Sequence, residues 1–183
     1  MARNTLSRSL HDLGLSAWFG GTLANAVALN AAAAEAGGDT GRVANAGWDR
    51  WTPVNAVAIG AHLVGSVGQI LGNKSRIAQQ PGVKTMSGVK TLLTVAALGA
   101  TAYRRSLGAK LDAAGNPRAR SGTKPAKLTK SELADAMDQL DTLQWVIPAL
   151  TGALVVVSSF AGEQQRASEV LKGVSTTTAA TTA

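Results

Sequence analysis

The sequence predicts an all-α membrane protein, a bundle of four transmembrane helices with an amphipathic helical lead-in to the fourth span. Three observations support this fold class. Long apolar runs alternate with charged connections, those runs are rich in Ala and Gly, and all four tryptophans stand within a few residues of a predicted span's end. Small residues favour packing between membrane helices because they let the backbones approach closely.

The average composition hides this segregation. Hydrophobic residues make up 45% of the 183 residues and the mean hydropathy is +0.09, which is unremarkable for a soluble protein. Nearly all charges lie in a few connecting segments, however, and the segments between them are almost uncharged. We therefore predict a basic N-terminal head over 1–12, one membrane domain over 13–163, and a polar, disordered tail over 164–183.

Four apolar runs are long enough, or nearly long enough, to cross the ~30 Å hydrocarbon core of a bilayer. They lie at about 13–34, 54–72, 89–107 and 144–161. The second run holds nineteen residues without Asp, Glu, Lys or Arg. The third has an uncharged core of only thirteen residues, so an interfacial or re-entrant segment is its alternative interpretation.

Turn and capping residues separate these runs. The glycine pair at 37–38 is expected to end the first helix. Thr52 is expected to cap the second span, with Pro53 at its first helical position. The Pro-Gly pair at 81–82 predicts a turn before the third span. Segment 129–144 carries apolar residues at helical intervals and predicts an amphipathic helix that runs into the fourth span.

Basic residues are concentrated in one connection. The net charge is +7, and eight of the eighteen basic residues lie in 104–130, which has a single acid and includes a predicted irregular loop over 108–130. Beside a membrane helix such a segment is expected to contact anionic lipid headgroups, and a simply solvated loop is the alternative. Because its one aromatic neighbour is Tyr103 at its edge, nucleic acid is not an expected partner. We expect a multi-pass protein of the inner (plasma) membrane, with an orientation that the charge distribution leaves open.

The second predicted span carries one polar stripe. Its members point within about 60° of one another at about 100° per residue, and they are Asn55, His62, Ser66 and Gln69. Polar groups in hydrocarbon need partners, so the stripe is expected to face the bundle interior, another subunit or water. His62 is the only ionisable side chain near a predicted bilayer centre, so it is either a ligand or proton site or a hydrogen-bonded packing residue. Residues that could supply its hydrogen bond in the second role are Asn25, Asn30, Thr94 and Ser158.

Two further sets of residues follow from the predicted spans. Close helix packing is expected at Gly20, Gly21, Gly60, Gly65, Gly68 and Gly72. Aromatic side chains at headgroup depth are expected at Trp18, Trp48, Trp51 and Trp145. No metal site is predicted, because His11 is expected to lie before the first span and outside the bilayer core. No catalytic motif and no cofactor motif is found either, so the chain is expected not to be an enzyme.

Three strings carry a resemblance to a family. HDLGLSAWFGG, RVANAGWDRWTPVNAVAIGAHLVG, and LQWVIPALTGAL with the following GEQQR resemble an uncharacterised family of actinobacterial four-helix integral membrane proteins with no assigned activity. The resemblance covers the spans and most of the first connection, but not the basic loop or the Thr/Ala tail. It implies a four-helix inner-membrane protein and nothing about mechanism.

These features lead to two functional hypotheses. The first is a non-enzymatic accessory or scaffolding subunit that acts through helix–helix contacts, as a homo-oligomer or within a membrane complex. The alternative is a small membrane transporter or channel, with a polar path lined by the stripe of the second span.

Overall fold

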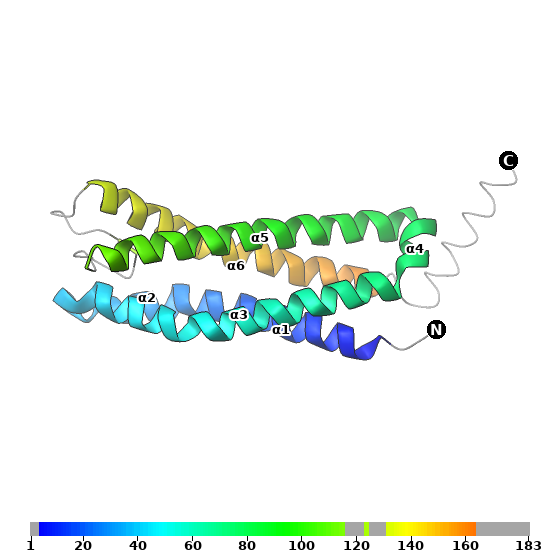
Figure 1. Cartoon of the computed structure of the whole chain (residues 1–183), viewed down its shortest axis with the longest axis horizontal. Coiled ribbons are helices and arrows are strands. Elements are labelled where there is room, and N and C mark those ends of the chain that lie inside the picture. Colours follow the sequence, from blue (N-terminus) through cyan, green and yellow to red (C-terminus); the bar gives the residue numbers. More distant parts are fainter. Residues whose placement is uncertain (1–3, 116–122, 125–130, 164–183) are drawn as a thin grey trace, which may run out of the picture.

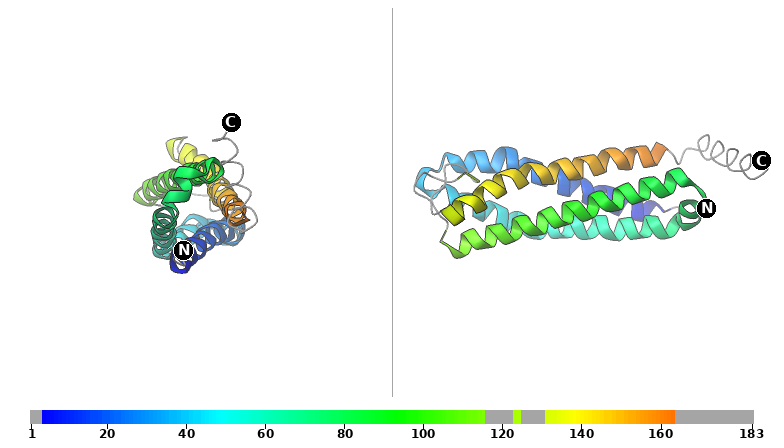
Figure 2. Two further views of the ribbon diagram at one scale, coloured as in Figure 1. Left: turned by 90° about the vertical axis from the view of Figure 1, so that its right-hand side faces the viewer. Right: turned by 90° about the horizontal axis from the view of Figure 1, so that it is seen from above.

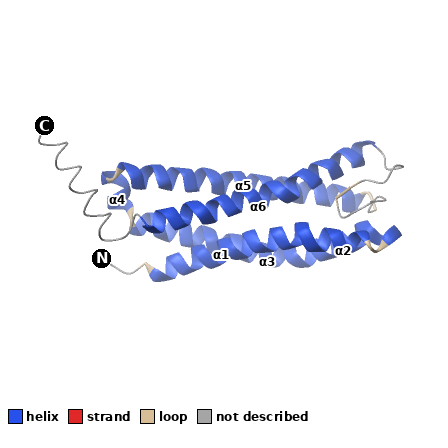
Figure 3. Cartoon of the chain, turned by 180° about the vertical axis from the view of Figure 1, so that it is seen from behind, coloured by secondary structure: helices blue, strands red, loops and turns tan. Residues whose placement is uncertain are grey.

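The structure is a computed structural model that describes residues 4–115, 123–124 and 131–163. All regular structure in these ranges is helical, which confirms the predicted all-α class (Figure 3). The elements are α1 (Thr5–Ala24), the π-helical η1 (Asn25–Leu29), α2 (Asn30–Ala34), the 3₁₀ turn η2 (Gly37–Asp39), α3 (Thr40–Gly72), α4 (Lys74–Gln79), α5 (Pro81–Ala113) and α6 (Ser131–Glu163).

The long helices lie side by side in an elongated bundle (Figures 1 and 2). The first long helix of the bundle consists of α1, η1 and α2, which follow one another without a break. The other three long helices are α3, α5 and α6. The most extensive contacts join α1 to α3 and α5 to α6, and α1 also packs on α6, whereas α3 and α5 contact each other only sparsely. We call the end where α1 begins and α6 ends the α4 end, and the opposite end the α2 end (Figure 1).

The connection between α2 and α3 is a tight turn, as the glycine pair predicted. Gly37 has a φ of 58°, in the left-handed region that a residue without Cβ adopts at little cost. The hydroxyl of Thr40 donates a 2.6 Å hydrogen bond to the Gly37 carbonyl oxygen. This bond fixes the start of α3 directly against the turn.

Two proline-based boundaries were wrong. Because α3 begins at Thr40, Pro53 lies inside that helix, and Thr52 donates to the Trp48 carbonyl at 3.0 Å instead of capping a new helix. Likewise α5 begins at Pro81, so the predicted turn residues open a helix. The apolar runs of the sequence mark only the segments suited to hydrocarbon. The helices that contain these runs continue into the polar residues on either side.

The helices are long relative to a bilayer. Each of α3, α5 and α6 has 33 residues, or about 50 Å at 1.5 Å per residue, against a hydrocarbon core of about 30 Å. Within the described residues, two helical segments are long and apolar enough to cross a membrane, Gly37–Gly72 and Ser131–Glu163. The amphipathic lead-in and the fourth predicted span form one helix, α6. Most of the predicted loop over 108–130, and the predicted tail, lie outside the described residues.

Among the described residues, several polar side chains are buried while many large apolar side chains are exposed. Of the seven largest fully buried side chains, four are polar: His11, His62, Thr40 and Thr151. Large apolar side chains instead face outward, with Val57 at 74%, Leu13 at 72% and Leu92 at 70% exposure. The outer surface of the bundle is therefore apolar on at least three helices.

The larger of two apolar core clusters in the described residues lies at the α2 end. It joins α5 to the first half of α6, and its buried members are Leu107, Leu111, Ala136, Met137 and Leu140. Nearby, the Tyr103 hydroxyl donates a hydrogen bond to Gln139, and Asn45 of α3 donates to Asp112 at 2.5 Å. The apolar side of the predicted amphipathic segment forms the α6 part of this core. The opposite, polar side of that segment is exposed.

Candidate functional site

Close contact between α1 and α3 builds the candidate site. A Cβ atom on Gly14 would overlap the backbone of Ala58 and His62, and one on Gly65 would overlap the backbone of Ser7 and His11. Because these positions lack a side chain, the two backbones approach closely, as in small-residue contacts between membrane helices. The contact places the two histidines of the chain beside each other.

The two imidazoles form a buried pair. The side chains of His11 and His62 are both 0% exposed, and their ring centroids lie 4.5 Å apart at an interplanar angle of 46°. Nothing in the sequence indicated that His11 and His62 would meet; α1 begins at Thr5, so His11 lies in its second turn and reaches α3. The pair is thus a contact between distant parts of the sequence.

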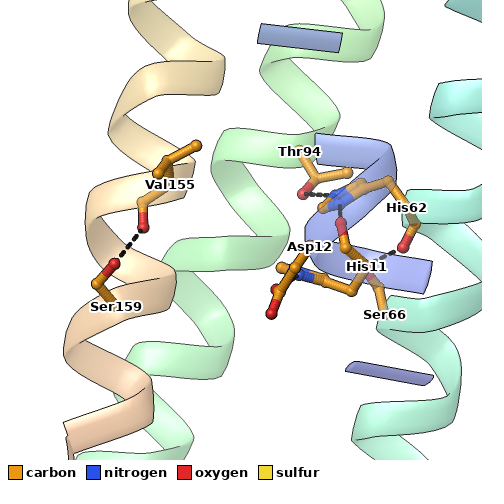
Figure 4. A network of polar contacts seen from close by, with 7 residues as sticks. All are labelled: His11, Asp12, His62, Ser66, Thr94, Val155 and Ser159. Carbon is orange, nitrogen blue, oxygen red and sulfur yellow. Dashed lines mark hydrogen bonds and ion pairs between the residues drawn. The ribbon is translucent and has the colours of Figure 1, made fainter. Parts of the chain in front are cut away.

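Each ring has a defined hydrogen-bond environment (Figure 4). Nδ1 of His11 donates to the Asp12 carboxylate at 2.7 Å, and in the neutral ring this bond makes Nε2 the acceptor nitrogen. That Nε2 atom is buried and has no partner among the described residues. His62 contacts the Thr94 hydroxyl through Nε2 at 3.3 Å and the His11 carbonyl through Nδ1 at 3.5 Å. Of the partners expected for His62, the structure pairs it with Thr94.

This arrangement suits proton or hydrogen-bond exchange better than metal binding. A carboxylate that holds one imidazole nitrogen leaves the other free to accept, as in catalytic and metal-site histidines. However, no group of three or more His, Asp or Glu side chains gathers closely enough in the described residues to hold a metal ion. The two rings are tilted against each other in direct contact.

The predicted polar stripe of α3 faces inward and meets the other helices to different extents. The Ser66 hydroxyl donates to the carbonyl of His62 in its own helix at 2.7 Å. Asn55 and Gln69 are partly buried, and Asn55 Oδ1 and Gln69 Nε2 have no partner among the described residues. Among these four residues, and within the described part of the chain, only His62 has a side-chain hydrogen bond to another helix.

Two hollows flank the histidine pair toward the α4 end. The first, about 280 Å³, lies between α3, α4 and α5 and reaches Thr94, the residue that contacts His62. The second, about 450 Å³, lies between α1, α5 and α6 and is lined in part by Asp12. Gln69, Lys90 and Ala161 line both hollows, so the two meet at these residues.

An apolar layer adjoins the histidines on the side of the α2 end. It consists of Trp18, Ala58 and Ala97, exposed by 0%, 6% and 0%. Trp18, for which a position at headgroup depth was expected, is buried in the bundle interior with its ring centroid 6.1 Å from that of His62. It lies about four turns into α1.

A second layer of polar side chains, after that of the histidine pair, lies on the far side of this apolar layer. Trp48 Nε1 donates to Asn30 at 3.1 Å, Asn30 donates to Gln144 at 2.6 Å, and Gln144 donates to Asp141 at 2.7 Å. The guanidinium of Arg104 stands 3.3 Å from the centroid of the Trp48 ring, which adds a cation–π contact. The layer links α2, α3, α5 and α6. Sequence reasoning missed it, although the uncharged amides at 30 and 144 within predicted spans were a usable signal.

Gln144→Leu should lower the free energy of unfolding by about 1–3 kcal/mol, because it leaves the buried Asn30 Nδ2 donor without its acceptor. Denaturation in mild detergent, followed by circular dichroism, measures this difference. Gln139→Leu is the matched control, since Gln139 is exposed on the same helix. Equal effects of the two substitutions would show that the buried amide pair does not hold the helices together.

The remaining predicted packing and aromatic residues divide into two groups. Positions at the α1–α3 contact, where an added Cβ would collide with a neighbour, are Gly21, Gly65, Gly68 and Gly72. At Gly20 and Gly60 the space around an added Cβ is open. Trp51 covers Gly21, and Trp145 is 51% exposed on the outer surface.

Comparison of the chain with protein-family profiles, with curated proteins and with solved structures gave no match. The function is therefore inferred from the geometry of the bundle and its buried polar groups.

Proposed function

We propose that this chain is a multi-pass membrane protein of the plasma membrane that acts without catalysis, as an accessory or scaffolding subunit. The observation that carries the membrane location is the outward exposure of large apolar side chains on a bundle that buries polar ones. Buried polar side chains such as His62 and Thr151 are sheltered by helices whose outer faces are apolar. This arrangement is stable where the surroundings are hydrocarbon, because polar groups there need partners inside the bundle.

The length of the helices supports an accessory role. About 20 Å of each 50 Å helix exceeds the hydrocarbon core, and the apolar core at the α2 end keeps this excess folded. Exposed charged residues on this part include Arg105, Lys110, Asp135 and Asp138. A rigid projection with charges of both signs suits contact with a partner protein, and its basic residues suit contact with anionic headgroups.

The glycine contact limits how copies of the chain could associate. Gly65 and Gly68 pack against α1 of the same chain, and Gly72 packs against Asn4 directly before it. A homo-oligomer would need an outer face, such as the α3 face that carries Gly60. Purification in mild detergent with mass determination tests the accessory role. We expect a defined oligomer or a complex of fixed stoichiometry, and a lone monomer would contradict the proposal.

A transporter is the second candidate, and one observation favours it. Buried polar atoms without partners among the described residues follow one another along the interior from the α4 end: Gln69 Nε2, His11 Nε2, Trp18 Nε1 and Asn55 Oδ1. Unpaired buried polar groups are rare in folded proteins unless water or a ligand satisfies them. The histidine pair would be the central binding site of this path.

His62→Ala separates the two candidates. If His62 holds the helices together, its loss lowers thermal stability or the yield of the assembled protein. If it forms part of a path, its loss abolishes solute or proton flux in proteoliposomes, while the fold persists. Thr151→Val is a control, because the buried Thr151 hydroxyl bonds only its own helix backbone. Unchanged stability, assembly and flux would contradict both roles of His62.

A further inference from the structure

We propose that the two hollows at the α4 end form one binding site for an anionic phospholipid of the surrounding bilayer. An acyl chain occupies the apolar hollow between α3 and α5, and the headgroup occupies the polar hollow beside α1 and α6. The inference rests on the proposed membrane location, but not on the choice between an accessory subunit and a transporter.

The apolar hollow has the walls and the opening that an acyl chain needs. Apolar side chains from both helices line it, namely Leu63, Val67, Ile70, Met86, Val95 and Leu98. Val67, Ile70 and Val95 are also 56%, 44% and 60% exposed, so the hollow opens sideways onto the outer surface. Because α3 and α5 contact each other only sparsely, a chain can enter from the hydrocarbon without displacing a packed interface.

The polar hollow offers groups that bind a phosphodiester. Arg8, Lys90, Ser158 and Ser159 line it, and the Arg8 guanidinium lies close to Gly162 near the end of α6. Lys90 forms no hydrogen bond or ion pair with any residue that the structure describes. Buried Ser158 Oγ likewise has no partner there. A headgroup phosphate would satisfy both of these groups.

Lys90 also explains how the two hollows act together. Lys90 lines both hollows. Gln69 lines both as well, and its Nε2 donor is buried without a partner among the described residues. An ammonium at this junction lies where the headgroup of a lipid joins its chains. The hollow between α3 and α5 then receives the chain directly below the charge.

The charge balance favours an anionic headgroup over a zwitterionic one. Segment 73–90 carries four basic residues and no acid. The two hollows together are lined by three basic residues, Arg8, Arg76 and Lys90, and by two acids, Asp12 and Glu163. Asp12 already accepts the hydrogen bond from His11. The basic side chains therefore exceed the carboxylates by one, and each basic residue near a lipid surface favours anionic lipid.

Lys90→Gln tests the headgroup contact. The purified protein in mild detergent is titrated with phosphatidylglycerol or phosphatidylcholine of identical chains, and bound lipid is counted by native mass spectrometry. We expect preferential binding of phosphatidylglycerol, weakened about fivefold by Lys90→Gln, the change that ~1 kcal/mol per basic residue gives. Lys84→Gln is the matched control, since Lys84 is exposed on the same helix and lines neither hollow.

Ser87→Phe tests the chain contact, because Ser87 lines the apolar hollow and a phenyl ring would fill it. We expect it to reduce binding of both lipids, whatever their headgroup. Equal binding of the two lipids, equal effects of the two lysine substitutions, or full binding by Ser87→Phe would overturn the proposal. Recovery of the chain in the aqueous fraction without detergent would instead contradict the proposed membrane location itself.

Discussion

Gly65→Ala is expected to lower the free energy of unfolding by about 1–3 kcal/mol, although alanine is the better helix former. The new Cβ would overlap backbone atoms of Ser7 and His11, which cannot rotate away as a flexible side chain can. To relieve the overlap, α1 must move away from α3, which separates His11 from His62. Unfolding in detergent, followed by circular dichroism, measures the loss.

Gly60→Ala is the control for this prediction. Gly60 lies on the same helix, but an added Cβ there meets no atom within 4 Å. Its replacement should leave the stability unchanged or raise it by up to about 1 kcal/mol through helix propensity. If the two substitutions changed stability equally, the close contact between α1 and α3 would not exist in the protein.

Trp18→Ala is expected to lower the free energy of unfolding by about 3–5 kcal/mol. Trp18 is fully buried against Ala58 and Ala97, so its loss leaves a cavity in the layer between the histidine pair and the α2 end. In a bilayer the lost packing contacts supply much of this cost, because lipid offers no hydrophobic drive between helices. The same unfolding measurement reports it.

Trp145→Ala provides the matched control, since Trp145 is 51% exposed. A ring this exposed contributes little to helix packing, so the expected change is well under 1 kcal/mol. A larger loss for Trp145→Ala than for Trp18→Ala would show that Trp18 lies at the membrane surface, as its sequence position predicted, and that the apolar layer is misplaced.

The sequence was a good guide to the helical class and to which face of α3 is polar. Periodicity alone placed His62 and Gln69 on one side of a helix, and the structure turns that side inward. The helix ends were harder to predict. Hydropathy detects only the segment suited to hydrocarbon, so Pro53 was predicted at the start of a span and Pro81 in a turn before one. In the structure Pro53 lies inside α3, and Pro81 is the first residue of α5.

The long-range contacts could not be read from the sequence. His11 and His62 are 51 residues apart and meet only because the backbones at Gly14 and Gly65 allow α1 and α3 to approach. The bond between Asn30 and Gln144 joins positions 114 residues apart. Such pairings depend on the relative rotation and register of two helices, which local periodicity does not determine.

Labelling of single-cysteine variants tests the proposed membrane crossing most directly. The chain has no cysteine, so Ala36→Cys and Ser75→Cys each introduce a single thiol, at exposed positions just beyond the two ends of α3. In intact cells, a membrane-impermeant maleimide should label only one of the two variants, and the other should react only after the membrane is permeabilised. Equal labelling of both variants before permeabilisation would contradict the account.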